Sequence, residues 1–372
     1  MSDTTLNAAA FADPALCRGL LETLEAELDG PFRFMEVCGT HTVSIFRSGL
    51  RSLLPEGVIH LSGPGCPVCV THDREIAAAM ALAGRDGVTI ATFGDLMRVP
   101  GPGGASLKSA KAEGAQVEIV YSPLDALALA RREKDRTVVF LGVGFETTAP
   151  TVAATMRMAR AEGLTNFAVL AFHKLVPPAL DALLAESGGA AQGTGIDGFL
   201  LPGHVSTIIG VEPYRFMADR YHKPGVVGGF DPADILQSLI LLIRMRKSKT
   251  PDIINQYSRA VSDQGNPRAR EMLFEVFEAS DALWRGIGLI RQSGLAIRDA
   301  YADYDARRRF SLELPDVPEI RGCKCGEVLK GRLAPDGCPL FGKTCTPASP
   351  VGPCMVSTEG SCAAYFKYGV EK

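Results

Sequence analysis

The chain has 372 residues, which corresponds to two or three domains at roughly 100–200 residues per domain. Apolar residues make up 46% and charged residues 22% of the chain, so a sizeable core can form and wholesale disorder is excluded. Lys and Arg total 39 against 42 Asp and Glu, and the net charge of -3 provides no basic footprint for nucleic acid. We therefore expect no DNA or RNA partner.

The most apolar run, residues 235–243, includes Gln237 and Ser238 and ends in a basic stretch. It falls well short of the roughly 20 apolar residues that span a bilayer. The first residues carry acidic side chains and lack the basic and apolar regions of a secretory signal. We expect a cytoplasmic protein with no membrane partner.

Leucines at helical spacing predict an amphipathic helix over residues 14–29, within an N-terminal helical segment 1–31. Short apolar runs separated by helical or loop stretches follow at 34–37, 58–61, 88–93, 117–121, 138–143, 167–172, 196–201 and 226–227. This alternation predicts an α/β fold with buried parallel strands. We divide it into two Rossmann-like parallel-sheet domains, residues 32–135 and 136–231.

Apolar residues in the next stretch, 232–312, recur at helical spacing and predict a helical segment. Two prolines within residues 314–318 then indicate a rigid connector. The final segment, 313–372, holds six of the ten cysteines of the chain. In a reducing cytosol such density indicates metal binding or thiol redox chemistry, so we predict a small cysteine-rich domain.

Reactive groups in open α/β sheets collect at the carboxyl ends of the strands. Four unusual segments follow predicted strands here: CGTH at 38–41, GPGCPVC at 63–69, GFETT at 144–148 and PGHVS at 202–206. Together they supply the candidate site residues Cys38, His41, Cys66, Cys69, Glu146 and His204. We expect His173 to be structural and assign no role to His60, His72 or His222.

Each candidate has an alternative explanation. The C-x-x-C pair of Cys66 and Cys69 fits a dithiol/disulfide couple or a soft metal, and we favour redox chemistry because no second pair lies nearby. Cys38 offers a soft thiolate for iron, or is simply a buried cysteine with His41 as a satisfied hydrogen-bonding neighbour. Helix capping explains the threonines after Glu146 but not its carboxylate.

The C-terminal cysteines lack the paired C-x-x-C knuckles typical of zinc sites. A [4Fe-4S] cubane needs four thiolates and tolerates irregular loops, and Cys338-Pro339 is similar to the Cys-Pro step of ferredoxins. Four ligands leave two cysteines, which can form a disulfide beside the cluster. Residues 337–344 also satisfy the P-loop pattern, but no buried strand precedes them and no helix is expected after them, so we reject a phosphate site.

Five segments in order resemble the HypD family of iron-sulfur maturation factors for [NiFe] hydrogenases. They are CGTHT at 38–42, GPGCPVC at 63–69, GFETTAP at 144–150, LPGHVS at 201–206 and CPLFGKTCTP at 338–347. The resemblance covers nearly the whole chain. It implies a two-domain α/β body with a cluster-bearing C-terminal domain.

The resemblance further implies a complex with a small HypC-type chaperone and cyanide delivery by a HypE-type protein. On this scaffold a transient iron with two CN ligands and one CO ligand would be assembled. Cys38 would be the iron ligand, and Cys66 and Cys69 the nearby redox pair. The C-terminal cysteines would hold a [4Fe-4S] cluster next to a thiol pair.

For the cluster ligands we predict Cys323, Cys338, Cys345 and Cys362, leaving Cys325 and Cys354 as the redox pair. Side chains two residues apart in an extended chain point to opposite sides, which argues against Cys323 and Cys325 serving one cluster. The choice of Cys354 over Cys362 depends on the resemblance. An alternative function is an iron-sulfur thiol-disulfide reductase, which needs the C-x-x-C pair but not Cys38. A metal-storage module would leave Glu146 and His204 without a purpose.

Overall fold

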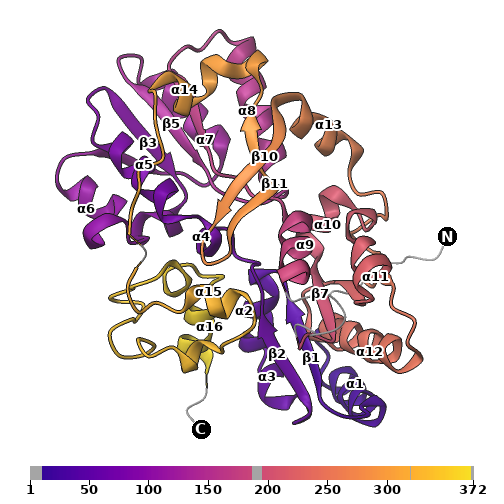
Figure 1. Ribbon diagram of the computed structural model, residues 1–372. Helices are drawn as coiled ribbons and strands as arrows, with labels where there is room; N and C mark the ends of the chain where they lie inside the picture. The colour runs from indigo at the N-terminus through magenta and orange to yellow at the C-terminus, as the bar shows by residue number, and fades with distance from the viewer. Residues whose placement is uncertain (1–10, 187–194, 319, 370–372) are drawn as a thin grey trace.

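The computed structural model describes residues 11–186, 195–318 and 320–369. Two parallel β-sheets, each covered by helices, form the body of the molecule, and a loop-rich C-terminal domain packs beside them (Figure 1). The predicted α/β architecture with two parallel-sheet domains is confirmed.

The first sheet has the strand order β2-β1-β7-β8-β9, and all its neighbouring strands are parallel. Its strands are β1 (Phe32–Glu36), β2 (Val58–Ser62), β7 (Gly198–Pro202), β8 (Gly225–Gly228) and β9 (Ile253–Asn255). The central strand β7 is buried along its whole length, as its continuous apolar sequence requires.

The second sheet has the order β4-β3-β5-β6 and is also parallel throughout. Its strands are β3 (Val88–Thr92), β4 (Gln116–Ile119), β5 (Thr137–Gly142) and β6 (Phe167–Ala171). Each of the eight apolar runs predicted as strands overlaps one of β1 to β8. The short strand β9 was not predicted.

The predicted domain ranges 32–135 and 136–231 do not coincide with the two sheets. Strands β3 and β4 belong to the second sheet, whereas β7 and β8 return to the first. The chain therefore crosses from the first sheet to the second after β2 and comes back after β6. Strand pairing across more than a hundred residues depends on tertiary packing, which local apolar patterns do not encode.

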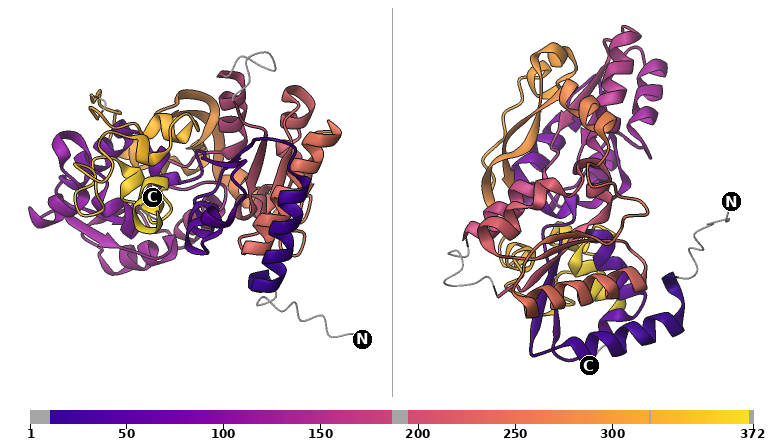
Figure 2. Two further views of the ribbon diagram at one scale, coloured as in Figure 1. Left: turned by 90° about the horizontal axis from the view of Figure 1, so that it is seen from below. Right: turned by 90° about the vertical axis from the view of Figure 1, so that its right-hand side faces the viewer.

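Helices connect and cover the strands. In chain order they are α1 (Pro14–Glu27), α2 (Gly39–Arg47), α3 (Leu50–Leu53), α4 (Pro67–Val70), α5 (Asp73–Ala83), α6 (Leu107–Ala112), α7 (Pro123–Arg132), α8 (Ala149–Ala161), α9 (Val176–Glu186), α10 (Gly203–Ile209), α11 (Phe216–Tyr221), α12 (Pro232–Ser248), α13 (Pro267–Val276) and α14 (Ala306–Arg309). The predicted N-terminal helix is confirmed as α1, which lies along α12 (Figure 2).

The segment predicted as helical, 232–312, is helical only in part. After α12 and α13 it forms an antiparallel hairpin of β10 (Phe277–Trp284) and β11 (Gly288–Ile297). The hairpin is held against the second sheet by the bridge between Lys174 and Gly294, and the Trp284 indole is fully buried. The apolar stripe of α13 ends at Val276, and cross-strand pairing then decides the conformation.

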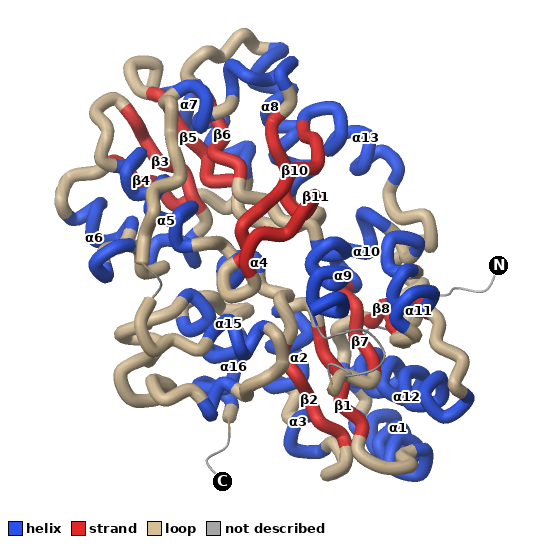
Figure 3. Tube along the Cα trace, viewed as in Figure 1, coloured by secondary structure: helices blue, strands red, loops and turns tan. Residues whose placement is uncertain are grey.

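The C-terminal domain consists mostly of loops around α15 (Cys325–Leu329) and α16 (Ser361–Tyr368), as Figure 3 shows. It packs on α2, where the rings of Phe46 and Tyr365 lie 4.7 Å apart. Arg51 adds a cation–π contact and donates a hydrogen bond to the Tyr365 hydroxyl at 3.1 Å. Among the described helices, none combines the length and hydropathy needed to cross a bilayer.

Candidate functional site

A cleft of about 590 Å³ opens between the carboxyl ends of the two sheets. Both sheets contribute the loops that follow their strands, and the C-terminal domain adds residues 357–359. The cleft is lined by Cys38, by residues 144, 145, 147 and 148, and by His204, which the sequence places after three different strands. The strand-end rule therefore brings these predicted segments to one place.

Cys38 occupies the junction between β1 and α2. It is the N-cap residue of α2 in an extended conformation, and only 8% of its surface is exposed. Its own N–H donates to the Glu36 carboxylate at 3.1 Å. Gly65 packs directly on this backbone, since a Cβ added there would lie 2.6 Å from the Cys38 Cα. The loop before Cys66 thus fixes the position of the Cys38 backbone.

The surroundings of the Cys38 thiol shift its pKa in both directions. Burial, followed by the negative charge of Glu359, raises the pKa of Cys38 to about 12. The N–H groups of Thr40 and His41 act in the other direction, because hydrogen bonds from them to the sulfur at the start of α2 lower its pKa. The thiol is protonated at pH 7, yet donors that would stabilise a thiolate are already in place.

Glu359 reaches the cleft from the C-terminal domain. Its carboxylate accepts a hydrogen bond from the Thr40 hydroxyl at 2.8 Å, and Gly39 has no room for a side chain because Glu359 packs against it. Burial raises the pKa of Glu359, and the neighbouring charges of Asp95 and Glu36 raise it further. A buried carboxyl group therefore stands next to the Cys38 thiol.

Asp95 holds the loop that carries Glu359. Its Oδ2 accepts hydrogen bonds from the Ser357 hydroxyl at 3.0 Å, from the Thr358 N–H at 3.2 Å and from the Thr358 hydroxyl at 3.3 Å. The second sheet thereby ties the C-terminal domain across the cleft. Asp95 and Glu359 were not predicted from the sequence, because neither forms a recognisable motif with a strand end.

His41 and His204 both pack against the Phe230 ring, with centroid distances of 4.6 Å and 4.0 Å. His41 is fully buried, and burial lowers its pKa to about 4. Its Nε2 lies 3.2 Å and 3.0 Å from the carbonyl oxygens of Gly228 and Gly229, so the neutral ring donates from Nε2. His41 is therefore buried and does not line the cleft, whereas His204 does.

Glu146 lies behind the cleft wall. One carboxylate oxygen accepts the Val176 N–H at 3.0 Å, and the other has no hydrogen-bond partner among the described residues. Burial raises the pKa of Glu146 to about 7. Burial raises the pKa of the Tyr214 hydroxyl, which has no hydrogen-bond partner in the described part of the chain, and the nearby Glu146 carboxyl group raises it further. Tyr214 is a further residue that the sequence analysis did not single out.

Cys66 and Cys69 form a disulfide at the start of α4. Both are buried, and the intervening Pro67 and Val68 line the cleft together with Gly65. The predicted C-x-x-C pair therefore lies at the cleft and is oxidised in this structure.

All six C-terminal cysteines line one small apolar cavity, whose other walls include Val328, Phe341 and Met355. Within the described ranges, no three His, Cys, Asp or Glu side chains are arranged as a site for a single metal ion. Convergence of six thiols in apolar surroundings nevertheless fits the donor set of a [4Fe-4S] cluster. The residues available to such a cluster are Cys323, Cys325, Cys338, Cys345, Cys354 and Cys362.

Two of these thiols are in direct contact. The sulfur atoms of Cys325 and Cys354 lie 2.9 Å apart, and both residues are buried. Hydrogen bonds with Cys323 and Cys354, aided by Arg285, lower the pKa of Cys325. The prediction that Cys323 and Cys325 point to opposite sides of an extended chain is wrong. Cys325 begins α15, and both residues line the same cavity. Spacing alone therefore does not separate ligand from redox thiol.

The P-loop-like segment 337–344 is confirmed as lacking its structural context. It follows a short 3-10 helix at Pro335–Gly337 and continues in turns, with a bridge between Phe341 and Cys345. Among the described residues, no strand leads directly into it and no helix begins directly after it, so it lacks the strand and the helix that a P-loop requires.

Comparison with known proteins agrees with this arrangement. Residues 15–369 match the family described as "HypD: Hydrogenase formation hypA family". The chain is 46% identical to hydrogenase maturation factor HypD2 of Bradyrhizobium diazoefficiens, covering 96% of each chain. It is also 46% identical to HypD of Rhodobacter capsulatus, covering 97% of this chain and 98% of that one, and 46% identical to HypD of Escherichia coli, covering 91% and 89%. The chain belongs to the HypD family of hydrogenase maturation factors.

Proposed function

We propose that the protein is a scaffold on which the Fe(CN)2CO unit of a [NiFe] hydrogenase is assembled, together with a HypC-type chaperone and a HypE-type cyanide donor. The observation that carries this proposal is the position of Cys38. It is a single thiol at the wall of a cleft formed by both sheets and the C-terminal domain. A plain thiol-disulfide reductase would need the Cys66–Cys69 pair but no further thiol at this place.

In the proposal Cys38 is the ligand that this chain gives to the incoming iron. The thiol has to lose its proton when the metal binds, and the N–H groups of Thr40 and His41 then stabilise the thiolate. Glu359 and Glu36, whose pKa values burial raises, are the nearby carboxylates that can take the proton. The chaperone would supply its own ligand at this cleft.

Iron that carries cyanide and carbon monoxide is kept in a low oxidation state, so electrons have to reach the cleft. The Cys66–Cys69 pair next to Cys38 would act as a two-electron store: its disulfide takes up two electrons and two protons to become a dithiol, and reoxidation of that dithiol releases them again. The Cys325–Cys354 contact provides a second thiol pair in the C-terminal domain. A [4Fe-4S] cluster held by Cys323, Cys338, Cys345 and Cys362 would supply single electrons when bound.

Replacement of Cys38 by alanine tests the proposal. In the complex with the chaperone, purified without oxygen, Cys38→Ala should abolish the infrared bands of cyanide and carbon monoxide while the visible absorption of the cluster stays. Cys17→Ala is the matched control, because Cys17 lies in α1 and does not line the cleft. Infrared bands unchanged in Cys38→Ala would remove the thiol from the assembly and favour the reductase.

Iron analysis tests the ligand assignment separately. Alanine variants of Cys325 and Cys354 should retain about four irons per chain, whereas variants of the four proposed ligands should lose most of them. If Cys354→Ala loses its iron and Cys362→Ala keeps it, the two roles are exchanged.

A further inference from the structure

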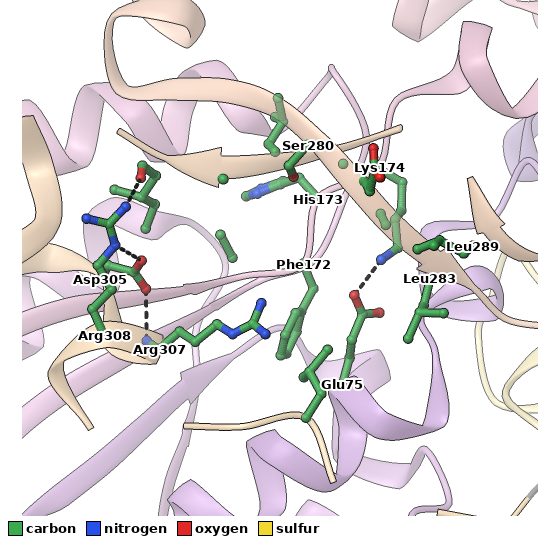
Figure 4. Close-up of a pocket in the computed structure, with 18 residues that line it drawn as sticks. Glu75, Phe172, His173, Lys174, Ser280, Leu283, Leu289, Asp305, Arg307 and Arg308 are labelled. Atoms are coloured by element: carbon green, nitrogen blue, oxygen red, sulfur yellow. Dashed lines mark hydrogen bonds and ion pairs between the residues drawn. The ribbon is translucent and has the colours of Figure 1, made fainter. Parts of the chain in front are cut away.

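The β10–β11 hairpin reaches from the second sheet to the C-terminal domain. Near β6, Lys174 bridges to Gly294 of β11 and forms the ion pair with Glu75 that Figure 4 shows beside the hairpin. The turn between the two strands lies at the other end, next to α4 and the C-terminal domain (Figure 1). Residues 284–288 of this turn and residues 323–327 together line a pocket of about 400 Å³. The hairpin therefore connects the second sheet with the cysteine-rich segment.

Two glycines allow the turn to touch the helix that begins with Cys325. Gly286 has a φ of 73°, and a Cβ added there would overlap the Gly326 Cα. A Cβ added to Gly326 would lie 2.7 Å from the Gly286 Cα, so neither position has room for a side chain. Gly326 directly follows Cys325 at the start of α15. Arg285 directly precedes Gly286, so the contact brings Arg285 and Cys325 to the same pocket.

Arg285 is buried, and the segment after α4 holds its side chain in place. The residue is 6% exposed, and its guanidinium forms an ion pair with Asp73, the first residue of α5. Its Nε donates to the Thr71 carbonyl at 3.4 Å, and its backbone N–H donates to the Val70 carbonyl at 2.9 Å. Because the guanidinium is withdrawn from solvent, its charge acts on neighbouring groups with little screening.

The groups next to Arg285 include two of the C-terminal cysteines. Cys323 and Cys325 line both this pocket and the small apolar cavity that all six C-terminal cysteines share. Contacts with Cys323 and Cys354 lower the pKa of Cys325, and the charge of Arg285 lowers it further. Lys324 is exposed, so solvent screens its charge more than that of Arg285. Arg285 is therefore the buried cation that favours negative charge at this end of the cysteine cavity.

We propose that Arg285 is a positioning residue of the C-terminal redox centre, whose fixed positive charge stabilises the reduced form of a [4Fe-4S] cluster held by the neighbouring cysteines. This role deepens the proposed function and rests on its assignment of a cluster to these cysteines. One-electron reduction adds one negative charge to the cluster, so a nearby cation raises the reduction potential. Asp73 offsets part of this effect, because it carries the opposite charge.

A redox titration followed by electron paramagnetic resonance tests this role on the full-length protein, purified without oxygen and with its cluster. Arg285→Gln should lower the midpoint potential, with a loss of at least about threefold in the reduction equilibrium constant, or about 28 mV for a one-electron couple. Asp73→Asn should raise the midpoint potential, because it leaves the charge of Arg285 without its partner. If the ion pair only held the turn in place, both variants would break it and shift the potential in the same direction or not at all.

Arg291→Gln is the matched control, because Arg291 is exposed on β11 and lines neither the pocket nor the cysteine cavity. It should change the equilibrium constant by less than about 1.5-fold. If Arg285→Gln does not retain its cluster, Asp73→Asn decides, and it has to raise the potential.

Three results would overturn the role of Arg285: an unchanged midpoint in Arg285→Gln, shifts in the same direction in Arg285→Gln and Asp73→Asn, or an equal shift in Arg291→Gln. A wild-type protein that holds no cluster would overturn the cluster assignment of the proposed function, and this role with it. A cluster that is present but whose potential does not respond to Arg285 would leave the proposed function standing.

Discussion

Gly65→Ala is a sharp test of how the Cys38 backbone is held. The new methyl group would lie within 2.6 Å of the Cys38 N and Cα and of the Val37 carbonyl carbon. All three are backbone atoms, so no side-chain rotation relieves the contact. Overpacking of this kind costs about 3 kcal/mol of unfolding free energy and shifts the backbone that carries the thiol.

Gly94→Ala is the matched control for this variant. Gly94 lines the same cleft, but an added methyl group meets only the Ile119 side chain at 3.8 Å, an ordinary packing distance. Urea-induced unfolding should show a loss of about 3 kcal/mol for Gly65→Ala and less than about 0.5 kcal/mol for Gly94→Ala. Equal unfolding free energies for Gly65→Ala and the wild type would refute the claim that this glycine fixes Cys38.

Three further changes address the charges around the cleft. Glu359→Gln removes the negative charge that helps to raise the pKa of Cys38, so alkylation of Cys38 by iodoacetamide at pH 8 should become about tenfold faster. An unchanged rate would show that Glu359 does not influence the pKa of Cys38. Because the pKa of Glu146 rises from 4.5 to about 7 on folding, the folded state holds the extra proton, and stability should fall by about 3 kcal/mol as the pH rises through this window. Urea titrations at pH 5 and pH 8 should show this loss of stability for the wild type but not for Glu146→Gln. An equal loss in both proteins would contradict the assignment of the pKa shift to Glu146. Asp95→Ala should cost about 1–3 kcal/mol and speed hydrogen exchange at residues 357–359, while exchange as slow as in the wild type would show that other contacts hold the loop.

Local sequence patterns predicted the strands and the meeting of their ends, but not how the strands pair. Short apolar runs, from two to six residues long, predicted the positions of β1 to β8. The hairpin after α13 was missed, because a sequence such as Ala279–Leu283 has no strong strand preference and depends on its partner.

The same limit applies to the cleft. Cys38, the segment 144–148 and His204 follow strands, so the rule for open sheets places them together. Glu359 and Asp95 come together only because the C-terminal domain packs across both sheets. His173 was expected to be structural, and its ring is buried against Phe277.

The interleaved order of the strands delays folding of the first sheet during synthesis of the chain. β1 and β2 leave the ribosome first, but β1 pairs on its other edge with β7, and the first sheet is not complete before β9 at residue 255. At roughly 5–20 residues per second, the ribosome needs on the order of 10–40 s to pass from β2 to β9. During this time the second sheet, whose strands are consecutive, can fold while the apolar edge of β1 waits for its partner. Nascent chains halted between β6 and β7 should therefore bind chaperones through residues 32–36.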